Sequence, residues 1–121
     1  MKRSQPKRAT ARAKADKAFS LWVRERDGRC VVRDWFPAIA CNGRLQCCHV
    51  VSRRYHAVRW VPENAVAGCA AHHLYGTHHP LEWEEAVKHA GIDLNNLRYL
   101  ALNDPPQDPD AVLEWLKGDG A

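Results

Sequence analysis

Apolar residues first recur at a regular spacing early in the chain. Ala15, Phe19 and Val23 lie four positions apart, which is the spacing of residues on one face of an α-helix. Gly28 follows this pattern, and glycine commonly ends a helix. The sequence therefore predicts a helix that begins near residue 13 and stops before Gly28. Residues 1–12 are basic and poor in apolar anchors, so we expect them to be a disordered arm.

Short apolar stretches between turn residues follow, and these are typical of β-strands. Residues 30–32 predict one strand and residues 45–51 a second, with an Asn-Gly turn signal at 42–43 between them. Residues 52–63 predict an irregular loop that carries several arginines. The apolar run at 65–68 predicts a third strand, which leads directly into a cysteine.

The second half of the chain returns to helical patterns. We expect one helix from about residue 70 to residue 75 or 76, and another that begins after Pro80 and ends at Gly91. The rest predicts a short strand or turn, a proline-rich linker and a last helix over 110–117. The fold class expected from these patterns is α+β, with an N-terminal helix and a C-terminal helical extension.

The net charge of +4 is unevenly distributed along the chain. Residues 1–29 contain ten Lys/Arg and three Asp/Glu, whereas the part from Leu81 onward contains nine Asp/Glu and three Lys/Arg. This asymmetry indicates that the basic end contacts a polyanion such as nucleic acid. A basic terminus that only promotes solubility is the alternative.

The length of 121 residues fits one domain. No apolar run approaches the ~20 residues that span a bilayer, and no apolar stretch follows the basic N-terminus as it would in a signal peptide. We therefore expect a cytoplasmic protein without membrane contact. In that reducing compartment, the odd number of five cysteines favours metal binding over disulfides.

A pair of soft metal ligands stands out among these cysteines and histidines. Cys69 and His72 are separated by two residues, so one turn can present both side chains to a tetrahedral zinc ion. Cys30 and Cys41 are the candidates for the other two ligands of this structural Zn²⁺, and either of the adjacent cysteines at 47–48 could substitute. The alternative is that these cysteines are small buried apolar residues.

Three further residues alternate with these ligands along the chain. His49 lies in a predicted strand, Asn64 follows the arginine-bearing loop, and His73 comes directly after His72. This order resembles the HNH nucleases encoded by bacteriophages and prophages. The resemblance covers about residues 19–90, and it is carried by the segments LQCCHVVSRR (45–54), VRW (58–60), PENA (62–65), CAAHH (69–73) and THHPLEW (77–83).

The resemblance implies a ββα-metal fold, in which two strands and a helix hold one catalytic divalent ion beside the zinc site. His49 would then be the general base that activates water, because a neutral imidazole accepts a proton near neutral pH. His73 would bind the catalytic ion, which could be Mn²⁺, Mg²⁺ or another divalent cation. Asn64 would fix the loop and the His49 ring, or ligate the ion. The implied activity is metal-dependent hydrolysis of DNA phosphodiester bonds, and a nicking enzyme of phage origin is one form of it.

Many HNH proteins carry a metal-binding aspartate at the position of Cys48. A thiol is a poor ligand for a hard cation such as Mg²⁺. We therefore expect the ion to be bound by His73 together with one of His78, His79 or Asn64. Such a histidine-rich shell would favour Mn²⁺, Ni²⁺ or Co²⁺.

The loop between His49 and Asn64 supplies the expected DNA contacts. Guanidinium groups bind phosphate in a bidentate manner, which points to Arg53, Arg54 and Arg59. A loop that is merely solvated is the alternative. The expected organisation is a basic arm (1–12), an HNH nuclease domain (13–100), and a proline-rich linker with a C-terminal helix (101–121).

Two other functions are compatible with the sequence. A non-catalytic zinc-bound DNA-binding module would keep the four zinc ligands but would not need His49 or His73. A structural or partner-binding protein would dock its basic arm on an acidic neighbour. The nuclease hypothesis makes DNA the substrate and adds phage packaging or recombination proteins as expected partners.

Overall fold

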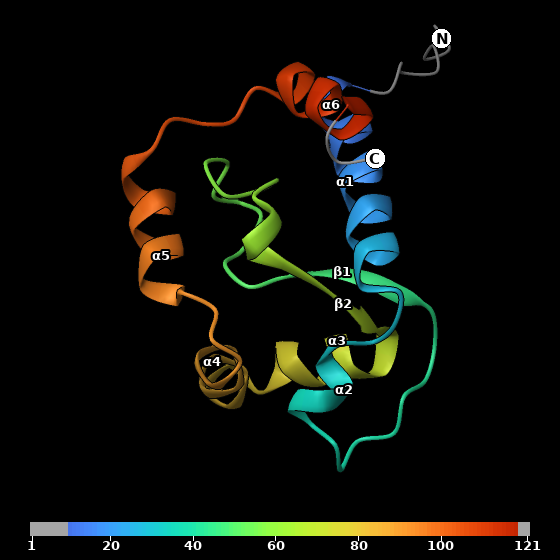
Figure 1. The fold of residues 1–121 in the computed structure, drawn as a ribbon. Helices are drawn as coiled ribbons and strands as arrows, with labels where there is room; N and C mark the ends of the chain where they lie inside the picture. The colour runs from blue at the N-terminus through green and yellow to red at the C-terminus, as the bar shows by residue number, and fades with distance from the viewer. Residues whose placement is uncertain (1–9, 119–121) are drawn as a thin grey trace, which may run out of the picture.

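The structure, a computed structural model, describes residues 10–118 and has an α+β fold (Figure 1). Two strands cross the centre of the molecule, and helices surround them. In chain order the described elements are α1 (Ala11–Asp27), α2 (Val32–Trp35), β1 (Leu45–His49), the 3-10 turn η1 (Pro62–Asn64), β2 (Ala65–Cys69), α3 (Ala70–His78), α4 (Pro80–His89), α5 (Leu94–Asn103) and α6 (Pro109–Gly118).

The two strands pair antiparallel and lead directly into α3. Leu45 lies opposite Cys69, and His49 lies opposite Ala65. Every residue of β2 is buried, so this strand is a continuous apolar run rather than an alternating one. The expected strand at 65–68 is therefore confirmed, and β2 also includes Cys69. The predicted α+β class is confirmed as well.

The first apolar cluster lies where α1 and α6 pack together. Ala15, Phe19 and Val23 form the buried stripe of α1, as their four-residue spacing predicts, and Leu116 of α6 packs against them. α1 begins earlier than expected, because Thr10 caps it by accepting a hydrogen bond from the backbone N–H of Ala13. Residues 10–12 are therefore helix cap and first turn. The rest of the predicted arm, residues 1–9, lies outside the described residues.

The second cluster lies around α2, on the other side of the sheet. Val32 and Phe36 pack here with Cys48 and Val66. The strand predicted for residues 30–32 is wrong. The N–H of Val31 bonds to the carbonyl of Ala67 in β2, but the chain then turns into α2 instead of continuing the pairing. The four-residue spacing of Val32 and Phe36 thus belongs to a helical turn and not to a strand.

The remaining element boundaries differ from the predictions for local reasons. β1 ends at His49 rather than at residue 51, because the N–H groups of Val50 and Val51 bond to Asn64. The expected strand or turn after residue 92 is instead the start of α5, which Asp93 caps through the N–H of Asn96.

The C-terminal helix is part of the packed structure. α6 packs on α1, where the rings of Trp22 and Trp115 meet edge to face at 5.3 Å. The domain boundary expected after residue 100 falls within α5. Between residues 10 and 118, no helix is long and apolar enough to cross a bilayer.

Candidate metal centre and catalytic groove

Four side chains that could hold a metal ion converge beside the start of α3. They are Cys30, Cys41, Cys69 and His72, and their ligand atoms all lie within 4.8 Å of one another. His72 is fully buried, and its Nδ1 atom is 3.1 Å from Sγ of Cys69 and 3.6 Å from each of the other two sulfurs. Three sulfurs and one imidazole are a donor set that tetrahedral zinc accepts.

Backbone groups orient these ligands. Nε2 of His72 donates to the carbonyl of Phe36 at 3.3 Å, which leaves Nδ1 as the nitrogen that faces the sulfurs. The N–H of Cys69 donates to Sγ of Cys30 at 3.2 Å, and the N–H of Asn42 donates to Sγ of Cys69 at 3.4 Å. Such donors stabilise thiolates, the form in which cysteine binds metal.

The close approach of the ligand atoms shifts the pKa values of the cysteine thiols. Burial opposes ionisation of Cys69, but hydrogen bonds from His72 and Asn42 outweigh it and lower the pKa of Cys69 to about 6. Desolvation and the neighbouring Cys30 and Cys69 raise the pKa of Cys41 to about 11. Thiolates packed this closely repel one another, and a divalent cation at their centre would offset that repulsion. The four residues therefore fit the predicted structural zinc.

The other two cysteines lie outside this cluster. Successive residues of β1 face opposite sides of the sheet. Cys47 packs toward α1, and Cys48 is fully buried in the second apolar cluster. Burial raises the pKa of Cys48 to about 12, so its thiol stays protonated. Neither cysteine substitutes for Cys30 or Cys41 in the cluster.

A groove of about 740 Å³ lies between α1, β1 and α3. His49 at the end of β1 and His73 on α3 both line it, although they are distant in the sequence. Arg24, Arg53 and Asp16 line the same groove. The structure therefore brings the two candidate catalytic histidines to one cavity with charged groups around it.

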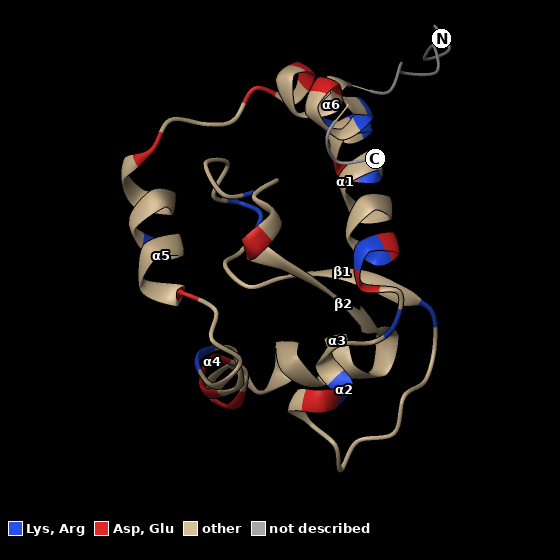
Figure 2. Cartoon of the chain, viewed as in Figure 1, with Lys and Arg blue, Asp and Glu red and all other residues tan. Residues whose placement is uncertain are grey.

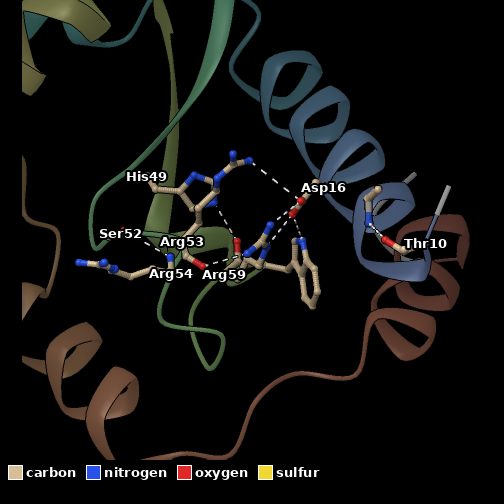
Figure 3. A network of polar contacts seen from close by, with 9 residues as sticks. Thr10, Asp16, His49, Ser52, Arg53, Arg54 and Arg59 are labelled. Carbon is tan, nitrogen blue, oxygen red and sulfur yellow. Dashed lines mark hydrogen bonds and ion pairs between the residues drawn. The ribbon is translucent and has the colours of Figure 1, made fainter. Parts of the chain in front are cut away.

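His49 is held in one tautomer. Its Nε2 atom is 2.8 Å from the carbonyl oxygen of Arg59 (Figure 3), and since a carbonyl only accepts, Nε2 carries the hydrogen. The neutral ring therefore has its lone pair on Nδ1. Burial lowers the pKa of His49 below its usual value, although the bond to Arg59 acts in the opposite direction. The ring is thus neutral, and able to accept a proton, at neutral pH.

His73 is held in the opposite tautomer. Its Nδ1 atom lies 2.6 Å from Oε1 of Gln46, an amide oxygen that only accepts, so Nδ1 carries the hydrogen. The lone pair is then on Nε2, and the bond to Gln46 orients the ring as is usual for a metal-binding histidine. Gln46 is on β1 and was not singled out from the sequence.

Asn64 is fully buried and fixes the loop between the strands. Its Oδ1 accepts from the N–H of Val51 at 2.7 Å, and its Nδ2 donates to the carbonyls of Val51 and Val58, both at 2.9 Å. Both amide hydrogens are used, and the side chain does not line the groove. Of the two roles expected for Asn64, the geometry fits loop fixation.

The expected additional ion ligands His78 and His79 do not line the groove either. His79 stacks on Tyr75 with ring centroids 3.9 Å apart, and its Nδ1 lies 2.8 Å from the Tyr75 carbonyl. His78 is exposed in the last turn of α3. Among these candidates, the structure therefore brings only His73 to the groove.

The three loop arginines lie in different environments. Arg59 is turned inward, and 12% of its side chain is exposed. Two of its nitrogens donate hydrogen bonds to the carboxylate of Asp16, at 2.6 and 2.8 Å. Arg53 lines the groove and is 62% exposed, and Arg54 points away from Asp16 toward solvent (Figure 3). Arg53 and Arg54 are thus accessible to a phosphate, whereas Arg59 is engaged within the protein.

The groove also contains Arg24, one of the N-terminal basic residues expected to contact a polyanion, and Asp16, for which the sequence predicts no role. Arg24 and Asp16 come from α1, which carries several of the basic residues, whereas most acidic residues lie from α4 onward (Figure 2). Asp16 is the first acidic residue in a strongly basic N-terminal part, and this isolation is the signal that could have identified it. No family model, curated protein or solved structure matches the chain.

Proposed function

We propose that this protein is a metal-dependent DNA endonuclease of the HNH, ββα-metal type. The observation that carries the proposal is the pairing of His49 and His73 in one groove, each with one ring nitrogen bonded within the protein and the other left with its lone pair. The order β1, β2, α3 and the adjacent cluster of zinc-type ligands support it.

In this proposal His49 acts as the general base. Its Nε2–H is held by the Arg59 carbonyl, so Nδ1 is the atom that takes a proton from the attacking water. Burial keeps the ring neutral at neutral pH, which maintains the base in its active form. Arg24 and Arg53 line the groove and would bind the phosphates of the substrate.

His73 would provide one protein ligand to the catalytic ion through Nε2. A divalent ion bound there would stabilise the charge that develops on the phosphate and on the leaving oxygen. An imidazole ligand favours Mn²⁺, Co²⁺ or Ni²⁺ over Mg²⁺. His72, the neighbour of His73, belongs to the zinc-type cluster, so that cluster fixes the first turn of α3 and with it the position of His73.

Cleavage of supercoiled plasmid tests this function. The wild-type protein with Mn²⁺ is expected to produce nicked or linear DNA, and His49→Ala is expected to reduce the rate by about 10²–10⁴-fold, the usual contribution of a general base. His73→Ala is expected to abolish most of the cleavage activity, together with its stimulation by Mn²⁺. His78→Ala is the matched control, because His78 is exposed and outside the groove.

Each other outcome points to a different function. Equal cleavage by the wild type and His49→Ala would remove the proposed base. DNA binding without cleavage, across Mg²⁺, Mn²⁺, Co²⁺ and Ni²⁺, would identify a non-catalytic zinc-bound DNA-binding module. No DNA affinity even at low salt would favour a partner-binding protein, since phosphate binding strengthens steeply as salt falls. If cleavage is found, the phage resemblance makes packaging or recombination proteins the partners to test first.

A further inference from the structure

The carboxylate of Asp16 joins α1 to the loop between the strands. It accepts hydrogen bonds from Nε and Nη2 of Arg59 at 2.8 and 2.6 Å, and from Nε1 of Trp60 at 2.9 Å (Figure 3). Arg53 also approaches it, at 4.0 Å. Asp16 is far from these residues in the sequence, and three donors converge on its two oxygens. This convergence fixes two consecutive loop residues, Arg59 and Trp60, against α1.

The same loop residue also orients His49. The side chain of Arg59 bonds to Asp16, and its carbonyl oxygen accepts from Nε2 of His49 at 2.8 Å. The direction of that carbonyl determines which nitrogen of His49 carries the hydrogen. A change in the position of Arg59 would therefore be transmitted to the ring of His49 through a single residue.

Neutral groups fix the loop on both sides of Arg59. Asn64 donates to the carbonyl of Val58 at 2.9 Å, and Gln107 accepts from the N–H of Trp60 at 2.8 Å. Asp16 supplies the charged attachment, which acts on Arg59 itself. Loss of Asp16 would therefore release the residue that holds His49, while the neighbouring backbone remains bonded.

We propose that Asp16 is a positioning residue, which holds Arg59 so that the Arg59 carbonyl keeps His49 in the tautomer with a bare Nδ1. This inference rests on the proposed function for its role in catalysis. The orientation itself is a property of the folded protein, and it can be measured without any cleavage of DNA.

Asp16 also contributes to the charge around His49. The titratable and charged groups around that ring are Asp16 and Arg24 on α1, Cys47 on β1, Arg53 and Arg59 in the loop, and His73 on α3. Burial lowers the pKa of His49, and the hydrogen bond to the Arg59 carbonyl raises it. The positive charges of Arg53 and Arg59 lower this pKa, and the negative charge of Asp16 raises it. Removal of the negative charge of Asp16 would therefore lower the pKa of His49, and the acidic limb of the rate profile would move to lower pH.

Asp16→Asn tests the proposal, because an amide has one acceptor oxygen and cannot reproduce the pairing of Nε and Nη2 of Arg59 with two separate oxygens. Long-range ¹H–¹⁵N NMR spectra would report the tautomer and the pKa of His49, and cleavage assays would report kcat. We expect a mixture of tautomers, a lower pKa of His49, and a kcat about 10- to 100-fold lower, which is typical of a mispositioned catalytic group. DNA affinity should not weaken, since a negative charge near Arg53 is removed.

Glu84→Gln is the matched control, because Glu84 also joins two elements by an ion pair with an arginine, Arg98, but lies outside the groove. Arg59→Lys removes the two-point attachment while keeping the charge, and it provides the same readouts if Asp16→Asn does not fold. A tautomer, pKa and kcat that change no more than in Glu84→Gln would overturn the proposal. A wild type that cleaves no DNA would instead remove the proposed function, and the tautomer comparison would still decide whether Asp16 orients His49.

Discussion

Sγ of Cys69 lies 3.1 Å from Nδ1 of His72, across the junction where β2 becomes α3. Cys69 is the last residue of β2 and His72 lies in the first turn of α3. The short distance between the two ligand atoms therefore depends on the strand ending at Cys69. Cys30 and Cys41 approach the same point from segments earlier in the chain. A metal ion bound by the four would tie α3 to the region around α2, and residues 10–118 otherwise pack around two small apolar clusters.

Metal removal should therefore destabilise the whole domain. The zinc site of small proteins supplies about 10–16 kcal/mol of apparent binding free energy, which is comparable to the total stability of a domain. We expect one zinc ion per chain by atomic absorption, and a strong decrease in Tm on addition of a chelator. Cys69→Ser should abolish zinc binding.

Cys48→Ala is the control for this prediction. Cys48 is fully buried but lies outside the ligand cluster, so its replacement should lower stability while the zinc content stays at one ion per chain. Loss of zinc in Cys48→Ala, with zinc retained in Cys69→Ser, would contradict the ligand assignment.

The free energy of unfolding should depend on pH because His49 is largely buried. The folded-state pKa of His49 is lower than its ordinary value of 6.5, so the unfolded state binds a proton more readily. The free energy of unfolding should therefore fall as the pH decreases below 6.5 toward the folded-state pKa. NMR titration should place the midpoint of His49 below that of free histidine in the same buffer. A midpoint at or above 6.5 would contradict the buried environment.

The loop arginines should separate into two classes of effect. Arg53 is exposed in the groove and binds phosphate in the proposed function, so on that proposal Arg53→Ala should weaken DNA binding and reduce the slope of log K against log salt by about one. Arg59 is paired with Asp16, so Arg59→Ala should lower the free energy of unfolding by about 1–3 kcal/mol. Fluorescence anisotropy and urea denaturation would measure the two effects.

Arg98→Ala on α5 is the reference for both measurements, since Arg98 is half-exposed and paired with Glu84 away from the groove. The distinction between a phosphate-binding Arg53 and a structural Arg59 would be wrong if Arg59→Ala changed the salt slope as much as Arg53→Ala and left the free energy of unfolding unchanged.

Asn64 should be among the most sensitive polar residues of the fold. Asn64→Ala would leave the N–H of Val51 and the carbonyl of Val58 without their partner in a buried region. We expect a loss of about 3 kcal/mol in urea denaturation. Asn103 is exposed and bonds only within α5, so Asn103→Ala should cost about 0.5 kcal/mol or less. Similar losses for the two variants would show that the loop does not depend on Asn64.

Several features could be predicted from the sequence because they depend on near neighbours. The four-residue spacing of Ala15, Phe19 and Val23 identified α1, and the apolar run after residue 64 identified β2. The sequence spacing of Cys69 and His72 identified them as a ligand pair. The helix α5 differs from the strand or turn expected there, although its signal, the cap at Asp93, is local.

The residue types of the site follow from the sequence: the soft ligands, two histidines at a strand end and on a helix, and a basic loop. Three-dimensional packing selects Cys30 and Cys41, rather than Cys47 and Cys48, to join His72, and it turns Arg59 toward Asp16 instead of solvent. Helices and caps form between residues close in sequence, whereas these contacts depend on how long loops close over the apolar clusters. Spacing along a chain does not encode that path.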